Sequence, residues 1–118
     1  MKMQIGEIAD RYSILMLKSE RTDLDVKAEL LAYKNAIKNY PQIDSFIEKL
    51  KSINGRIWDL ESDIRKGKEN ELGLEEVGRR AIMIRDINGE RVACKNEITI
   101  HYAEGYVETK YEHASQSN

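Results

Sequence analysis

The stretch "IDSFIEKLKSINGRIWDLESDI", residues 43–64, decides the fold of this chain. Its apolar residues recur at steps of 3 and 4, which is the spacing of one face of an α-helix. They are Ile43, Phe46, Leu50, Ile53, Ile57, Leu60 and Ile64. Asn54-Gly55 would suit a hairpin turn between strands, but the helical period passes through it without a change of phase. The stretch therefore predicts one long helix over about 42–66.

A second Asn-Gly pair lies in a similar context further along the chain. Helical spacing that starts at Leu74 and continues to Ile98 predicts a second long helix over about 74–99, antiparallel to the first. Glycine inside a helix costs roughly 1 kcal/mol relative to alanine. We therefore expect Gly55 and Gly89 to mark a close approach where the two long helices cross. The alternative is that both lie on exposed faces that tolerate them.

Two shorter helices precede this pair. Helical spacing predicts the first over about 4–21 and the second from a cap at Thr22 or Asp23 to the only proline, Pro41. A linker at 66–73 then separates the long helices. The pattern predicts an all-α four-helix bundle with a long antiparallel pair.

The first helix carries the apolar run "ILML" at 14–17, which extends around most of its circumference. Such a helix is covered on two sides, either within its own bundle or by another subunit. We therefore predict a homo-oligomer that associates through leftover apolar surface on the first or second helix.

The chain has 118 residues, the size of one ordinary domain. We place that domain at 1–99, followed by a C-terminal arm at 100–118. Tyr102, Tyr106 and Tyr111 make this an aromatic arm, which we expect to dock at least as far as the third tyrosine. A frayed terminus is the alternative.

Charge and cysteine content limit the partners and the compartment. The formal net charge is -2, so the chain lacks the positive field that drives nonspecific binding to nucleic acid. A single cysteine and the lack of an apolar stretch long enough to span a membrane predict a protein of the reducing cytoplasm.

Polar residues enter the apolar ladder of the second long helix at Asn88, Arg91 and Lys95. In one interpretation the buried stripe shifts onto Ile87 and Cys94, while the two cations lay their stems on apolar surface and keep their heads in water. In the other, the helix lines a polar groove that offers two cations and an amide to an anionic ligand.

The first long helix has a matching ribbon of polar and aromatic residues beside its apolar stripe. Its members are Asn54, Trp58, Glu61 and Arg65. The indole of Trp58 could stack on a base or anchor a partner, but a lone tryptophan is more often part of a core. The default interpretation of Glu61 and Arg65 is a surface ion pair.

The sequence contains no phosphate-binding glycine loop and no histidine-rich metal motif, so we predict no catalytic residue, metal or cofactor. Helical nucleotide pyrophosphohydrolases hold magnesium with carboxylates at i, i+3 on two helices. Glu7 and Asp10 show that spacing once. We interpret the pair as a complement to the dipole of a helix N-terminus.

Four pieces of the chain carry a resemblance to a known family: "IGEIADRYSILMLKSER", "IWDLESDIRKGK", "RDINGERVACKNEI" and "EGYVETKYEHAS". They resemble a family of small uncharacterised helical proteins of bacteria and large tailed phages, whose phage members include T-even-type proteins named valyl-tRNA synthetase modifier. The resemblance implies a compact helical binding protein without an accepted activity. The matching polar positions are Glu7, Asp10, Lys18, Arg21, Asn54, Trp58, Asp59, Glu61, Asp63, Arg65, Asn88, Arg91, Lys95, Glu97, Glu108, Lys110 and Tyr111.

These observations leave two functions open. In the first, a non-enzymatic protein grips a host protein, such as an aminoacyl-tRNA synthetase in the host cytoplasm, through Trp58 and the charged ribbons, including Lys18 and Arg21 from the resemblance. In the second, Arg65, Arg91 and Lys95 line a groove that sequesters a small anionic nucleotide. A pyrophosphohydrolase is a distant third.

Overall fold

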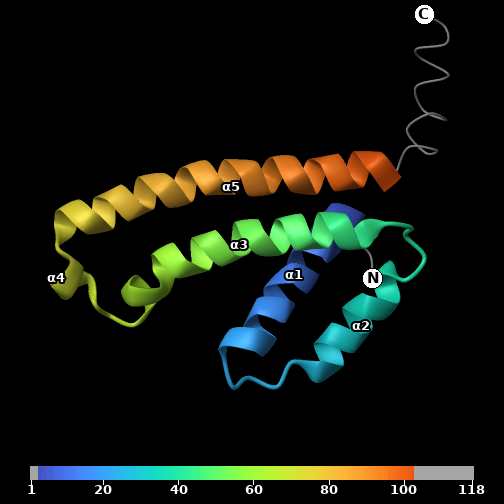
Figure 1. Ribbon diagram of the computed structural model, residues 1–118, viewed down its shortest axis with the longest axis horizontal. Helices are drawn as coiled ribbons and strands as arrows, with labels where there is room; N and C mark the ends of the chain where they lie inside the picture. Colours follow the sequence, from blue (N-terminus) through green and yellow to red (C-terminus); the bar gives the residue numbers. More distant parts are fainter. Residues whose placement is uncertain (1–2, 103–118) are drawn as a thin grey trace, which may run out of the picture.

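The computed structural model describes residues 3–102, and this part of the chain is all-α, as predicted. Figure 1 shows its five helices and no strand within the described range. They are α1 (Ile5–Arg21), α2 (Lys27–Ile37), α3 (Ile43–Arg65), the short α4 (Glu69–Leu72) and α5 (Leu74–Tyr102).

The two long helices α3 and α5 lie side by side and antiparallel, and both Asn-Gly pairs are helical. The prediction of a long antiparallel pair is therefore confirmed. Helix α5 continues three residues beyond its predicted end at 99, and α4 occupies part of the predicted linker at 66–73.

The N-terminal hairpin of α1 and α2 crosses this pair at an angle (Figure 1). Helix α1 contacts α2, α3 and α5, whereas α2 packs chiefly on α1. The result is a junction of α1, α3 and α5 with α2 on its flank, a looser arrangement than the predicted four-helix bundle.

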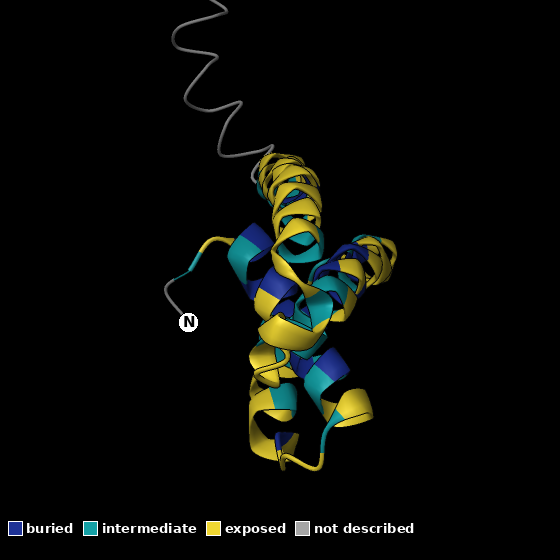
Figure 2. Ribbon diagram, turned by 90° about the vertical axis from the view of Figure 1, so that its left-hand side faces the viewer, coloured by how far each residue is buried: buried dark blue, intermediate teal, exposed yellow. Residues whose placement is uncertain are grey.

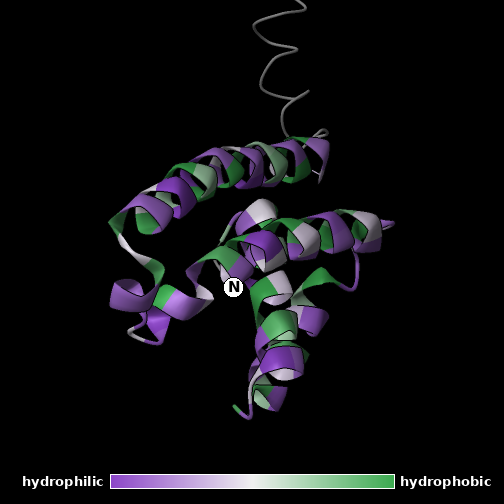
Figure 3. Ribbon diagram, turned by 60° about the vertical axis from the view of Figure 1, so that its left-hand side comes forward, coloured by the Kyte–Doolittle hydropathy of each residue, from purple (hydrophilic) through white to green (hydrophobic). Residues whose placement is uncertain are grey.

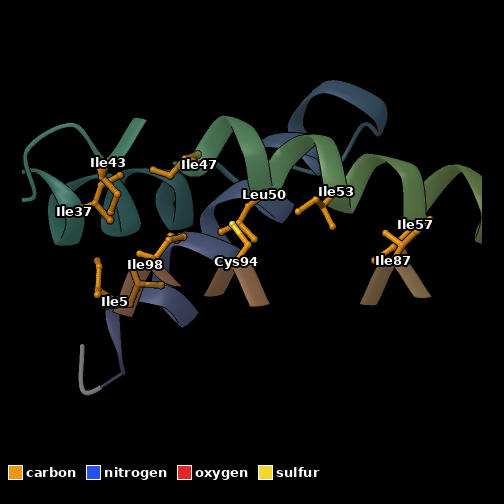
Figure 4. Close-up of a cluster of buried hydrophobic side chains, with 12 residues drawn as sticks. Ile5, Ile37, Ile43, Ile47, Leu50, Ile53, Ile57, Ile87, Cys94 and Ile98 are labelled. Carbon is orange, nitrogen blue, oxygen red and sulfur yellow. The ribbon is translucent and has the colours of Figure 1, made fainter. Parts of the chain in front are cut away.

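The core lies where these three helices meet (Figure 4). Helix α3 contributes most of its predicted apolar face, although its last turns, with Leu60 and Ile64, are only half-buried. Helix α5 buries only Ile87, Cys94 and Ile98. Burial therefore decreases toward the end where α3, α4 and the start of α5 meet (Figure 2).

The glycines do not mark a crossing of the two long helices. A Cβ at Gly55 would lie 3.2 Å from a guanidinium nitrogen of Arg21, so the close approach there is with α1. A Cβ at Gly89 would meet no atom within 4 Å, which matches the exposed alternative. The tightest approach is at Gly6, where a Cβ would lie 2.1 Å from the backbone oxygen of Lys95.

The second helix begins later and ends earlier than its apolar spacing predicts. Thr22 does not cap it, because its hydroxyl donates to the carbonyl oxygen of Lys18 at 2.7 Å and accepts from the amide of Leu24 at 3.1 Å. These bonds end α1 instead. At the other end, α2 stops at Ile37 and a turn leads to α3.

Only the start of the predicted aromatic arm falls within the described residues. Tyr102 is helical, and its hydroxyl donates to the carbonyl oxygen of Pro41 at 2.6 Å. Its ring stacks edge-on against Tyr40, with 5.3 Å between centroids. The prediction for 103–118 lies outside the described residues.

Candidate functional site

The charged residue Asp10, on the inner face of α1, is fully buried, with none of its surface exposed. Arg91 of α5 binds both of its carboxylate oxygens, at 2.9 Å and 2.6 Å. The side-chain amide nitrogen of Asn54, on α3, donates both to one of the same oxygens and to the hydroxyl oxygen of Ser13, each at 2.9 Å. One carboxylate thus joins three helices.

Lys95 lies one turn further along α5 and extends this arrangement. Its ammonium donates to Glu7 at 2.9 Å and lies 3.9 Å from a carboxylate oxygen of Asp10. We call this set the Asp10 cluster. Its members are Glu7, Asp10, Ser13, Asn54, Arg91 and Lys95. Two acidic and two basic side chains make it electrically neutral.

The cluster holds its carboxylates in the ionised form. Burial by itself raises the pKa of Asp10, but hydrogen bonds from Arg91 and Asn54 and the positive charges nearby outweigh it, so its pKa lies below the usual value. The hydrogen bond from Lys95 likewise lowers the pKa of Glu7. A carboxylate with both oxygens engaged is a poor proton acceptor near neutral pH, so the cluster is suited to joining helices rather than to acid–base chemistry.

Neither sequence interpretation of Arg91 and Lys95 describes their surroundings. The buried stripe does shift onto Ile87 and Cys94, but the two cations pair with carboxylates on α1 instead of ending in water. They are also not free to line an anion groove. The interpretation of Glu7 and Asp10 as a dipole complement is wrong for Asp10, which is a buried partner of α5.

Trp58 is half-buried, and two arginines lie near its ring. The guanidinium carbon of Arg65 lies 4.6 Å from the centroid of the indole, and that of Arg21 lies 5.9 Å from it. Arg65 also pairs with Glu61, and Arg21 pairs with Asp59 at 2.7 Å. The structure therefore brings together four of the predicted binding residues in a second, surface cluster, where arginines contact the ring that was considered for stacking.

Two predicted site residues belong to neither cluster. Lys18 is on α1 and lines a shallow depression with Arg11 and Tyr33. Asn88 is half-buried on α5, and its side chain makes no hydrogen bond within the described residues.

The outer side of α5 exposes large apolar residues. Ile82 and Val92 are each 54% exposed and Ile100 is 63% exposed. Figure 3 shows hydrophobic and hydrophilic residues interleaved along this helix. Ile82, Gly89, Ala93 and Ile100 follow one another at steps of 7, 4 and 7, which returns each to the same side of the helix. We call this surface, with Val92 beside it, the outer face of α5.

Sequence reasoning missed Asp10 as the partner of Arg91 on α5 and Ser13 as a partner of Asn54 on α3. The signal was present in the apolar run at 14–17: if α1 is covered on two sides, the small polar residues between its apolar ones are buried too. Buried polar groups require partners, and the polar residues predicted on the inner side of α5 could supply them.

Within residues 3–102, no group of three histidine, cysteine, aspartate or glutamate side chains is placed to hold a metal ion. None of the described helices is long and apolar enough to span a membrane. The chain matches no protein-family model, no curated protein and no solved structure.

Proposed function

We propose that this chain is a non-enzymatic binding protein that grips another protein, with the outer face of α5 as the contact surface. The observation that carries the proposal is the set of large apolar side chains, Ile82, Val92 and Ile100, left exposed along one long helix. Exposed apolar side chains on one side of a helix are candidates for the centre of a protein contact. A host protein such as an aminoacyl-tRNA synthetase remains the partner class that the phage resemblance suggests.

The Asp10 cluster favours this function over a nucleotide sponge. An anionic ligand of Arg91 and Lys95 would have to displace Asp10 and Glu7, and a buried carboxylate without its cation is costly. The pyrophosphohydrolase is disfavoured for the same reason, because its magnesium ligands would be carboxylates that these cations already neutralise.

Self-association is a second candidate use of the outer face of α5. The apolar run on α1 is largely covered within the fold, since Leu15 and Leu17 are buried. In an antiparallel pair of α5 helices centred on residue 91, Ile82 would lie opposite the second copy's Ile100, and Gly89 opposite its Ala93. Large residues then meet large ones and small residues meet small ones. Sedimentation equilibrium should show a species larger than 13.7 kDa.

The test is capture from bacterial lysate by immobilised protein, with mass spectrometry of retained proteins and small molecules. The Ile82→Glu, Val92→Glu variant should lose the captured protein, because two charges enter the apolar contact. Leu24→Glu is the matched control, since Leu24 is similarly exposed but lies between α1 and α2. Capture of the same proteins by all three forms would contradict the proposal. Retention of a nucleotide that is lost in Arg91→Met, Lys95→Met would support the sponge instead.

A further inference from the structure

A concave surface lies between α1 and α2. A depression of about 410 Å³ has the apolar side chains of Met16, Leu30 and Leu31 in its walls, together with Tyr12. A neighbouring depression of about 350 Å³ shares Tyr12 and Lys34 with it and continues to Tyr40, Pro41 and Asp44. The two depressions adjoin at these shared residues, and together we call them the α1–α2 groove.

One rim of this groove is a row of lysines. Lys27 and Lys34 of α2 and Lys38, the helical-conformation residue directly after it, follow one another at steps of 7 and 4, so they lie on the same side, with Leu31 among them. All three are exposed and line the groove. Within residues 3–102, none of the three forms an ion pair.

The acidic residues of the groove do not balance this row. Glu20 is in one wall, but it pairs with Lys51 of α3. Asp44 lies at the far end, in the second depression. The charge left for a partner along the rim is therefore positive, although the chain as a whole is negative.

We propose that the α1–α2 groove binds an acidic amphipathic helix of another protein. The apolar stripe of such a helix would fill the groove between Tyr12, Met16 and Leu31, and its acidic residues would meet the lysine row. Helix-in-groove recognition has these two components, an apolar stripe and a charged rim. The proposal rests on the protein-binding function above, but it uses a different surface from the outer face of α5.

The shape and chemistry of the groove favour a helix over other acidic partners. A lipid bilayer presents a broad surface, whereas the apolar wall here is limited to Tyr12, Met16, Leu30 and Leu31. A nucleic acid would supply phosphates for the lysines but would leave the aliphatic and thioether side chains of the walls without a matching apolar surface.

The probe is a synthetic peptide of about four helical turns, capped at both ends, with leucines at i, i+4, i+7 and i+11 and glutamates flanking them. Its binding to the full chain is followed by fluorescence anisotropy of a label on the peptide. We expect saturable binding that weakens as salt is added. A peptide with lysines in place of the glutamates should not bind.

The decisive variant is Lys34→Glu, Lys38→Glu, which reverses two exposed charges that have no partner in the described fold. It should weaken binding about tenfold, since each exposed ion pair contributes modestly and each attraction becomes a repulsion. Lys66→Glu, Lys68→Glu makes the same change of charge beyond the end of α3, away from the groove, and should bind like the unchanged chain. Leu31→Ser should weaken binding through the apolar contact alone.

Absence of saturable binding by the acidic peptide would overturn the proposal, as would equal binding of the acidic and basic peptides or unchanged affinity in Lys34→Glu, Lys38→Glu. Binding of phosphatidylserine vesicles or of tRNA that depends on these lysines, without binding of the acidic peptide, would also overturn it. If the peptide fails while lysate capture still depends on Ile82 and Val92, only the assignment of the groove fails. Peptide binding without that capture supports the assignment of the groove and contradicts the proposal that the outer face of α5 is a contact surface.

Discussion

The two halves of α5 differ in their surroundings although they form one uninterrupted helix. The C-terminal half, residues 87–102, buries Ile87, Cys94 and Ile98 and places two cations on carboxylates of α1. The N-terminal half, residues 74–86, buries no residue, although Ile84 packs against the core from a half-buried position.

The difference lies in whether α1 is present. Both halves carry apolar residues at helical spacing, although the stripe shifts onto Ile87, Cys94 and Ile98 in the second half. A helix face becomes core only where a second layer covers it. The N-terminal half also makes polar contacts with α3: Arg80 donates to the carbonyl oxygen of Leu60 at 3.3 Å and lies 3.6 Å from Asp63. The C-terminal half thus holds the fold together through its inner side, while exposed apolar residues of the outer face of α5 occur in both halves, Ile82 in the first and Val92 and Ile100 in the second.

The largest expected effect follows from removing the carboxylate of the Asp10 cluster. Asp10→Ala should lower the free energy of unfolding by about 3 to 5 kcal/mol, because Arg91 loses its buried partner. Replacing Arg91 with methionine in the same chain should recover much of this loss, since no unpaired charge then remains. Urea denaturation of both variants measures it. A loss below about 1 kcal/mol in the single variant would mean that the cluster does not clamp the C-terminal half.

Gly6→Ala tests the close contact of α1 with the C-terminal half. Its Cβ would lie 2.1 Å from the backbone oxygen of Lys95 and 2.5 Å from the hydroxyl of Thr99. Backbone cannot yield as a flexible side chain does, so we expect a loss of about 2 kcal/mol. Thermal unfolding of the variant should show a clear drop in Tm, and an unchanged Tm would place α1 further from α5.

Acid should weaken the stabilising effect of the Asp10 cluster. The pKa values of Asp10 and Glu7 are lower in the folded chain than the usual 3.8 and 4.5. The unfolded chain therefore binds more protons, so this stability is complete above the usual pKa values and is lost as pH falls through the folded ones. Asp10→Asn should flatten the fall in unfolding free energy below about pH 5.

Glu76 is the matched carboxyl in the N-terminal half. Hydrogen bonds from Arg79 and Arg80 lower its pKa to about 2, but the side chain of Glu76 is 31% exposed, whereas Asp10 is fully buried. Glu76→Gln should change the acid dependence less than Asp10→Asn does, because solvent screens a carboxylate that it reaches more than one that is buried. An equal change would remove the distinction between the two halves.

The smallest expected effect is a gain in stability. Gly89→Ala fills open space on the outer face of α5, so it should stabilise the chain by up to about 1 kcal/mol through helix propensity. If a second helix approaches this face closely, the same variant should weaken capture of the partner. Urea denaturation and lysate capture on one preparation distinguish the two effects, and a loss of stability would show that the site is not open.

Much of the fold followed from local pattern. The helical class, the bounds of α3 and the antiparallel pair were predictable because apolar spacing and phase are properties of neighbouring residues. The bounds of α2 were not, because Val26 and Tyr40 keep the helical spacing although they lie outside the helix. The hydroxyl of Thr22 ends α1 there, and spacing does not reveal which helix a capping side chain serves.

The candidate site divides in the same way. The sequence by itself determined that polar residues would enter the seam of α5 at Asn88, Arg91 and Lys95, since their positions on the helix follow from counting. Only the tertiary structure decided what they do, because the partners of Arg91 and Lys95 lie more than 80 positions away along the chain on α1. Local spacing carries no information about contacts across such separations. The crossing of α1 over the long pair therefore decided which cations are buried and which surface remains available.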